Sequence, residues 1–319
     1  MISILICTRN RSSHLKKTLH SLAEVKCPEG MSVEVLIVDN GSTDETCKVV
    51  EKILLPNFDK RYILEPTKGK SHAFNRGLRE AQGGVILFTD DDVRFPKNWI
   101  AEMSEPILEG KADAVAGGVR IAPHLERPWM EPWHRAYLAS SKRIESDAPD
   151  DMVGANMAIA RHVVETVPRS DEELGPGALG ACQESHFADR IYRAGFRIAP
   201  AFDVEVEHHF DPSRLKRSSW KQAAQKLGRS QAYIHYHWRH EQQTFPDGRM
   251  RPYLELVWLY AKMTLKRLLH VKDVMQEEGM ASWESYYLRQ ISYIRQGIKE
   301  RRRPRLYEKY GPRKKTMEG

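Results

Sequence analysis

The sequence predicts an α/β fold with a mainly parallel, Rossmann-like sheet, helices on both faces and a helical C-terminal extension. Two observations predict this class. Through the first half of the 319-residue chain, short apolar runs alternate with segments of helical spacing, which is typical of parallel strands joined by crossover helices. Beyond about Ser218 the pattern is helical.

The first half supplies the strands and helices in regular order. Residues 2–8 predict the first strand, and Leu15, Leu19 and Leu22 follow at helical spacing. The next expected elements are a strand at 33–38, a helix that begins near Thr43 or Asp44, a short strand at 62–64, a helix over about 71–81 and a strand from Val85. Three strand ends then meet at one edge of the sheet, where open α/β folds bind ligands: Thr8-Arg9, Asp39-Asn40 and Asp90-Asp91-Asp92.

The second half is more irregular. A strand is expected around Ala112 to Val115 and another at 156–160, and Gly175, Gly177 and Gly180 predict a loop before a helix near Gln183. Gly195 is placed to end that helix. We expect three parts: residues 1–217, made of two halves that meet near residue 118, then a helical extension (218–300) and a basic tail (301–319).

Charge and cysteine content narrow the class of protein. The four cysteines form no CxxC pair, which favours reduced thiols in the cytoplasm over a disulfide scaffold. Met1 leads directly into a strand pattern, so we expect no signal peptide. The net charge is +7, and residues 295–319 contain ten Lys or Arg and three Glu. This tail is interpreted as a contact for the anionic inner face of the cell membrane or as a solvated terminus; no aromatic stacking module accompanies it, so specific nucleic-acid binding is not expected.

One later helix has a continuous apolar face. Seven residues share it: Leu254, Val257, Trp258, Ala261, Leu265, Leu268 and Leu269. Lys262, Lys266 and Arg267 interrupt any membrane-spanning run. Two interpretations remain, packing on the preceding α/β body and an interfacial position in a membrane, and we favour packing.

The acidic run 90–92 is the main candidate metal site. Asp90 and Asp92 share one face of an extended chain, and two such charges at ~4 Å repel by roughly 4 kcal/mol at an effective dielectric near 20. A hard divalent cation, Mg²⁺ or Mn²⁺, would remove this repulsion. The alternative is a solvated cluster that caps the next helix.

Two strings together indicate a family. Residues 37–46, IVDNGSTDET, and residues 88–92, FTDDD, closely resemble the family 2 glycosyltransferases of GT-A fold, and the resemblance runs from Ile2 to about Leu227. The resemblance implies transfer from a nucleotide sugar, with uridine diphosphate preferred and guanosine or thymidine diphosphate open. It also implies that residues 1–118 form a nucleotide-sugar half and residues 119–217 an acceptor half. The residues expected to bind the nucleotide are Thr8, Arg9, Asp39, Asn40, Lys68, Gly69, Asn75, Asp90 and Asp91. No Walker A motif is present, because Leu64 stands where its first glycine is needed.

The resemblance also implies the remaining site residues. Asp92, Asp90 and His208 are expected to bind the metal, with His209 as a second choice to His208. Glu184 matches the general base that would take a proton from the acceptor hydroxyl, and Asn156 matches an acceptor-binding position. Gln183 and His186 replace acidic residues of the commoner pattern.

The function expected from this resemblance is inverting, metal-dependent transfer of a sugar to a hydroxyl, on a glycan or a lipid-linked acceptor. Cell-surface polysaccharide or glycolipid synthesis would use such a reaction. Two alternatives remain. A non-catalytic module of a membrane-associated complex would bind nucleotide sugar or glycan without turnover, whereas a glycoside hydrolase would use two carboxylates without nucleotide or metal.

Overall fold

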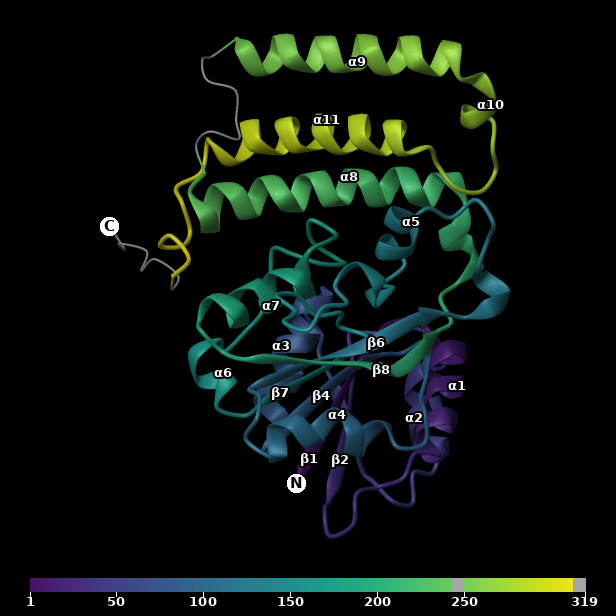
Figure 1. Cartoon of the computed structure of the whole chain (residues 1–319), viewed down its shortest axis with the longest axis vertical. Coiled ribbons are helices and arrows are strands. Elements are labelled where there is room, and N and C mark those ends of the chain that lie inside the picture. The colour runs from purple at the N-terminus through teal and green to yellow at the C-terminus, as the bar shows by residue number, and fades with distance from the viewer. Residues whose placement is uncertain (242–249, 312–319) are drawn as a thin grey trace. The chain divides into compact units, whose positions relative to one another are not determined.

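A computed structural model describes residues 1–241 and 250–311. The chain divides into two compact units (Figure 1). The first contains Met1–Ala178 and Gln183–Asp211, and the second contains Leu179–Cys182 and the chain from Pro212 onward. Part of the predicted basic tail, including Arg313, Lys314 and Lys315, lies outside the described residues.

The first unit is built on one eight-stranded sheet of order β3-β2-β1-β4-β7-β6-β8-β5. Neighbouring strands from β3 to β4 run parallel, β7 is antiparallel to both β4 and β6, and β8 returns parallel to β6. This arrangement confirms the predicted mainly parallel α/β sheet. The strands are β1 (Ile2–Thr8), β2 (Val33–Asp39), β3 (Asp59–Leu64), β4 (Val85–Asp90), β5 (Val93–Arg94), β6 (Ala114–Ile121), β7 (Asn156–Ala160) and β8 (Ile198–His208).

Helices cover both faces of this sheet because side chains alternate along each strand. Ile2, Ile4 and Ile6 join one apolar core with helices α1 (Ser12–Ala23), α2 (Thr46–Lys52) and α4 (Trp99–Leu108). Leu5 faces the opposite core, with α3 (Lys70–Glu80), α6 (Val163–Thr166) and α7 (Gln183–Arg193). The connection between β6 and β7 carries α5 (Pro132–Tyr137) and the 3₁₀ turns Pro123–Leu125 and Ser141–Arg143.

Several element boundaries differ from the sequence prediction, and β3, expected at 62–64, already begins at Asp59. The helix expected near Thr43 or Asp44 begins at Thr46. Asp44 stays outside it because its carboxylate accepts hydrogen bonds from the backbone N–H groups of Ser12 and Thr46. The strand expected to end near Val115 continues to Ile121, because β6 pairs with β8 on both sides of a bulge at Gly117 and Gly118.

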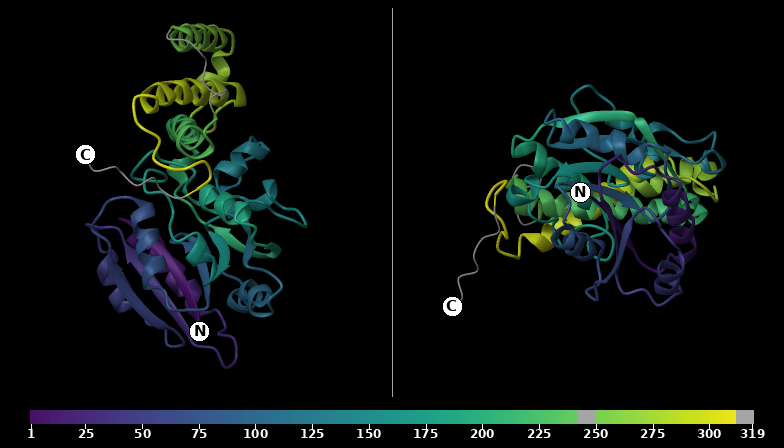
Figure 2. Two further views of the ribbon diagram at one scale, coloured as in Figure 1. Left: turned by 90° about the vertical axis from the view of Figure 1, so that its left-hand side faces the viewer. Right: turned by 90° about the horizontal axis from the view of Figure 1, so that it is seen from below.

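The second unit is helical, as predicted. It contains the 3₁₀ turn Pro212–Leu215, α8 (Arg217–Ile234), a π-helical turn (His235–Arg239), α9 (Arg251–Leu269), α10 (Val271–Val274) and α11 (Ser282–Glu300). Helix α11 packs against both α8 and α9 (Figure 2, left, where α9 and α11 are green and yellow). Among the described residues, no helix has the length and apolar character that crossing a bilayer requires.

Within the helical unit, no described residue covers the apolar face predicted for α9. Leu254, Val257 and Leu268 are 65%, 68% and 69% exposed. Helix α9 instead buries Pro252, Leu259 and Met263 on its other side. The spacing correctly identified an apolar face but did not reveal which side of the helix is covered by other elements.

Candidate functional site

The ends of three neighbouring strands form the candidate site. In the sheet register, Thr8 at the end of β1 is paired with Asp39 at the end of β2, and Cys7 of β1 is paired with Asp90 at the end of β4. The strand ends that the sequence predicted to meet therefore lie side by side. The polar side chains at this edge come from segments far apart along the chain.

Asp91 is the innermost member of the acidic run. Its carboxylate accepts a hydrogen bond from Thr8 Oγ1 at 2.7 Å and lies 2.9 Å from Arg11 Nε, and its backbone carbonyl accepts a bond from Thr18. Burial raises the pKa of Asp91 to about 7, although the charge of Arg11 acts in the opposite direction. Asp91 thus anchors the run to β1 and α1, with its side chain turned inward.

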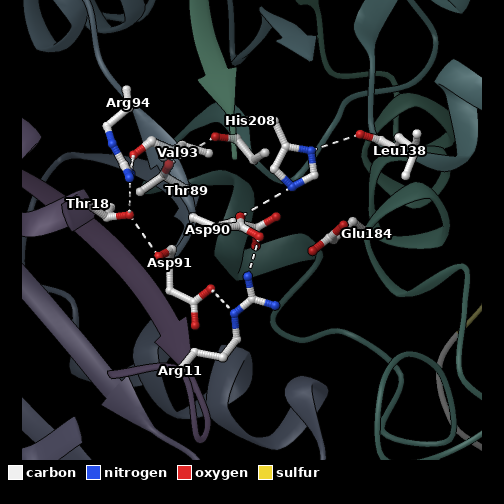
Figure 3. Close-up of polar contacts among 12 residues, drawn as sticks. Arg11, Thr18, Thr89, Asp90, Asp91, Val93, Arg94, Leu138, Glu184 and His208 are labelled. Carbon is white, nitrogen blue, oxygen red and sulfur yellow. Dashed lines mark hydrogen bonds and ion pairs between the residues drawn. The ribbon is translucent and has the colours of Figure 1, made fainter. Parts of the chain in front are cut away.

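Asp90, Asp92 and His208 form the cluster that suits a metal ion. One potential ligand atom from each lies within 4.8 Å of the others. His208 Nδ1 is 2.8 Å from the Leu138 carbonyl oxygen, which can only accept, so this nitrogen carries the hydrogen (Figure 3). The other ring nitrogen, Nε2, therefore faces Asp92 Oδ1, 3.3 Å away. A cation between them would stabilise these two facing acceptors, and the donor set of two carboxylates and one imidazole fits Mn²⁺ or Mg²⁺.

His209, the second choice, does not join this cluster. Its ring nitrogen Nε2 is 2.6 Å from Glu207 Oε1, and its backbone N–H donates to the carbonyl of Asp92. Arg217, the first residue of α8, pairs with the fully buried Glu284 of α11.

Two cations balance the acidic groups, and neither was among the predicted site residues. Arg11 pairs with both Asp91 and Asp92, and Lys70 Nζ lies 2.7 Å from Asp90 Oδ1 and 2.5 Å from Glu184 Oε1. Burial alone would lower the pKa of Lys70, but the charges of Asp90 and Glu184 raise it well above its usual value. Arg11 ends the string TRNR, which begins at the last residue of β1, and Lys70 ends the string KGK at the first residue of α3. Their positions close to acidic strand ends are the sequence feature that could have identified both residues.

Glu184 reaches the site from the first turn of α7. Together with Lys70 and Asp90 it lines a small pocket whose other lining residues include Leu5, Cys7, Phe74 and Phe88. Gly154 makes room for its carboxyl group, because a Cβ at this position would lie 2.3 Å from Glu184 Cδ. The predicted base and the predicted metal residues therefore share one site.

Two of the predicted nucleotide-binding residues, Asn40 and Asn75, use their side-chain amides in hydrogen bonds within the protein. Asn40 donates to the carbonyls of Glu65 and Thr67 and accepts from the N–H of Gly69. Asn75 exchanges hydrogen bonds with the backbone of Ser170. Both hold loops that border the site, so we treat them as positioning residues.

Asn156 has no surface to offer an acceptor. It is fully buried, accepts a hydrogen bond from Trp99 Nε1 and donates to the carbonyls of Gly118 and Val204. Its amide joins β7 to β6 and β8. We therefore leave Asn156 out of the proposed acceptor site.

The remaining predicted nucleotide contacts surround the end of β2. Asp39 is buried, and its two oxygens accept from the Ser42 N–H at 2.8 Å and the Tyr62 hydroxyl at 2.7 Å. Burial and the charge of Asp39 raise the pKa of Tyr62, so the phenol stays a donor. Three further predicted contacts lie in loops: Arg9 directly after β1, and Lys68 and Gly69 directly before α3. Arg9 is half-buried, Lys68 is exposed and Gly69 is buried.

Open α/β folds bind their ligands at the carboxyl ends of the parallel strands, and here that edge of the sheet carries the acidic cluster. A family model described as Glycosyl transferase family 2 matches residues 3–167, more than half of the chain. The chain belongs to glycosyltransferase family 2, as its motifs predicted.

Curated proteins with similar sequences are also named as glycosyltransferases. The chain is 24% identical over 243 residues to the probable glycosyltransferase YdaM of Bacillus subtilis, covering 73% of this chain and 56% of the relative. It is 26% identical over 205 residues to the glycosyltransferase AglE of Haloferax volcanii, covering 64% of this chain and 65% of AglE. The alignments thus span less than two thirds of each relative.

Solved structures show the same fold. The mannosyltransferase PcManGT of Pyrobaculum calidifontis, in complex with GDP-Man and Mn²⁺, gives a TM-score of 0.58 at 18% identity, covering 94% of this chain and 86% of PcManGT. Residues 1–349 of S. aureus TarS, in complex with UDP, give 0.52 at 18% identity, covering 94% of this chain and 91% of that one. The predicted GT-A-type fold is confirmed.

Proposed function

We propose that this protein transfers a sugar from a nucleoside diphosphate sugar to a hydroxyl acceptor, with inversion at the anomeric carbon. The observation that carries this proposal is the meeting of Asp90, Asp92 and His208 with Glu184 at one edge of the sheet. A glycoside hydrolase, which works with two carboxylates, has no need for such a cluster of metal ligands. The family assignment supports the same reaction class.

Asp90, Asp92 and His208 would hold the divalent ion. When bound, this ion supplies positive charge that stabilises the departing diphosphate. Arg11 keeps Asp92 in place through its ion pair, and the Leu138 carbonyl fixes the His208 ring with Nε2 toward the carboxylates. These contacts preorganise the ligand set before any donor arrives.

Glu184 would act as the general base. Its carboxylate would accept the proton of the acceptor hydroxyl while the hydroxyl oxygen forms the new bond to the anomeric carbon and the bond to the diphosphate oxygen breaks. The ammonium of Lys70 holds this carboxylate at 2.5 Å, and Gly154 leaves the space that it occupies. Attack on the face opposite the leaving group turns an α-linked donor into a β-glycoside.

Donor and acceptor classes are part of the proposal. Thr8, Arg9, Asp39, Lys68 and Gly69 surround the strand ends where the nucleotide would lie, with uridine diphosphate preferred. A hydroxyl on a polysaccharide or glycolipid is the proposed acceptor. Two partial relatives support this class: the succinoglycan biosynthesis protein ExoM of Rhizobium meliloti, and a beta-monoglucosyldiacylglycerol synthase of Nostoc.

The decisive experiment compares wild type, Glu184→Gln and Asp92→Asn with a panel of nucleotide sugars, measuring released nucleoside diphosphate and, by calorimetry, nucleotide affinity. We expect Glu184→Gln to lower turnover by about 10²–10⁴-fold with nearly unchanged nucleotide affinity. Asp92→Asn should instead weaken binding in the presence of Mn²⁺. Unchanged turnover in Glu184→Gln would reject the base assignment. Tight nucleotide-sugar binding by wild type with no release would favour the non-catalytic binding module.

A further inference from the structure

Helix α9 exposes an apolar surface that the proposed reaction does not use. Its buried residues, Pro252, Leu259 and Met263, lie on one side of the helix. On the opposite side, seven apolar residues at helical spacing are all exposed. We call this set the α9 stripe: Leu254, Val257, Trp258, Ala261, Leu265, Leu268 and Leu269.

The α9 stripe is more continuous than the exposed apolar residues of an ordinary protein surface. Folded proteins show scattered exposed apolar residues, but a contiguous patch of this kind marks a binding surface. Helix α11 packs on α9 from the other side, and no described residue of the helical unit covers the stripe. Its members span α9 from its first turn to its last residue and include no charged residue.

The borders of the stripe are basic and aromatic. Lys262 and Lys266 follow one edge, and the Lys262 ammonium lies 3.8 Å from the centre of the Trp258 ring. Tyr253 and Tyr260 lie on the other edge and are exposed. Glu255 is the only acidic residue of α9, against four Lys or Arg. Leucines flanked by lysines, with Trp and Tyr beside them, are typical of helices that lie in the headgroup region of a bilayer.

We propose that α9 docks on the surface of an anionic lipid bilayer, with its axis in the plane of the membrane. The stripe enters the boundary between headgroups and acyl chains, and Lys262 and Lys266 contact lipid phosphates. A bound position along the surface agrees with the finding that no described helix can span a bilayer. A symmetric pair of α9 helices is less favourable, because it brings the Lys262 and Lys266 ammonium groups that border the stripe in each copy to one interface. This inference does not depend on the donor chemistry.

Vesicle flotation of the full chain tests the proposal. The vesicles contain either phosphatidylcholine alone or equal parts of phosphatidylcholine and phosphatidylglycerol. The test variant is Leu254→Glu/Leu268→Glu. Its matched control, Leu54→Glu/Leu108→Glu, adds the same charge at two exposed leucines of the first unit, 80% and 48% exposed. A third variant, Lys262→Ala/Lys266→Ala, tests the basic border.

We expect wild type and the control to float with anionic vesicles and the stripe variant to bind on the order of tenfold more weakly or worse. Loss of each lysine should weaken binding by about fivefold, and high salt should reduce binding by wild type. Equal flotation of wild type and stripe variant would overturn the proposal. So would a wild-type dimer in sedimentation that becomes monomeric in the stripe variant without any vesicle binding. A melting temperature equal to that of wild type shows that the stripe variant is folded. An equal rise in melting temperature on adding nucleotide and Mn²⁺ shows that its proposed donor site is intact, so that a loss of vesicle binding is independent of the proposed catalysis.

Discussion

Gly154 leaves the space into which the proposed base extends. A Cβ at this position would lie within 2.7 Å of three Glu184 side-chain atoms, so any larger residue displaces that carboxyl group. The atoms in the way belong to the far end of a flexible side chain. The fold can therefore adapt at little cost, whereas the position of the carboxylate cannot be kept.

Gly154→Ala should consequently separate activity from stability. We expect the melting temperature to change little and turnover to fall by about 10²-fold, the cost of misplacing a catalytic group by an ångström. Steady-state kinetics and a thermal melt measure the two effects. Gly84→Ala is the control, because a Cβ there meets nothing within 4 Å. Wild-type turnover in Gly154→Ala would show that the exact position of Glu184 does not matter.

Among the strands, one buried carboxylate on β2 joins three neighbouring segments. Glu34 accepts hydrogen bonds from Ser3 Oγ at 2.5 Å, the Gln82 N–H at 2.6 Å and Arg61 at 2.9 Å. Burial alone would raise the pKa of Glu34, but these hydrogen bonds lower it below the ordinary value of 4.5. The ionised form therefore stabilises the fold at pH values above 4.5, and this contribution is lost as the pH falls through the lower folded-state pKa.

Glu34→Gln should thus destabilise the protein most at neutral pH. We expect the free energy of unfolding to drop by about 1–3 kcal/mol there, and the difference from wild type to shrink in acid. Urea denaturation at a series of pH values measures this. Glu45→Gln removes an exposed carboxylate, 66% exposed, and should behave like wild type. A difference independent of pH would contradict the assigned role of the charge.

Helices α8 and α11 are in close backbone contact at Gly228. A Cβ there would lie 2.2 Å from the Arg289 carbonyl oxygen and 3.1 Å from the Tyr293 backbone nitrogen. Because these are backbone atoms, one helix would have to shift.

Gly228→Ala should therefore destabilise the helical unit by about 1–3 kcal/mol, despite the gain of about 1 kcal/mol that alanine brings to an isolated helix. Circular dichroism during chemical denaturation tests this. Ser218→Ala, at an exposed position of the same helix, is the control. A more stable Gly228→Ala protein would mean that α8 and α11 can separate without cost.

For the chain as a whole, ligand binding should appear as increased thermal stability, because a ligand that binds only the folded state shifts the unfolding equilibrium. At a hundredfold excess over its Kd, a nucleoside diphosphate with Mn²⁺ should add about 2.7 kcal/mol. We expect a rise of several degrees in the melting temperature of the first unit, and loss of most of this rise with a chelator or in Asp92→Asn. Each variant is compared with itself without ligand. An identical rise with chelator and with Mn²⁺ would argue against metal-assisted binding.

Local patterns were sufficient to predict strands β1 to β4, β6 and β7 and the place of the site, whereas β5 and β8 were not predicted. Apolar runs identify buried strands, and parallel strands bring their carboxyl ends to one edge, so Thr8, Asp39 and Asp90 had to meet. The two strings around Asp39 and Asp90 predicted the family, which the family model confirms. The metal-binding, base and nucleotide roles of the individual residues stay predictions.

Tertiary contacts decided which polar groups are available and which surfaces are covered. The sequence predicted Asn156 as an acceptor-binding residue. Its amide instead donates to backbone carbonyls of β6 and β8, two strands that become its neighbours only in the folded sheet. Lys70 could not be assigned to Glu184 because 114 positions separate them in sequence. The spacing of α9 predicted an apolar face, yet periodicity relates residues of one helix to each other and carries no information about what packs against them.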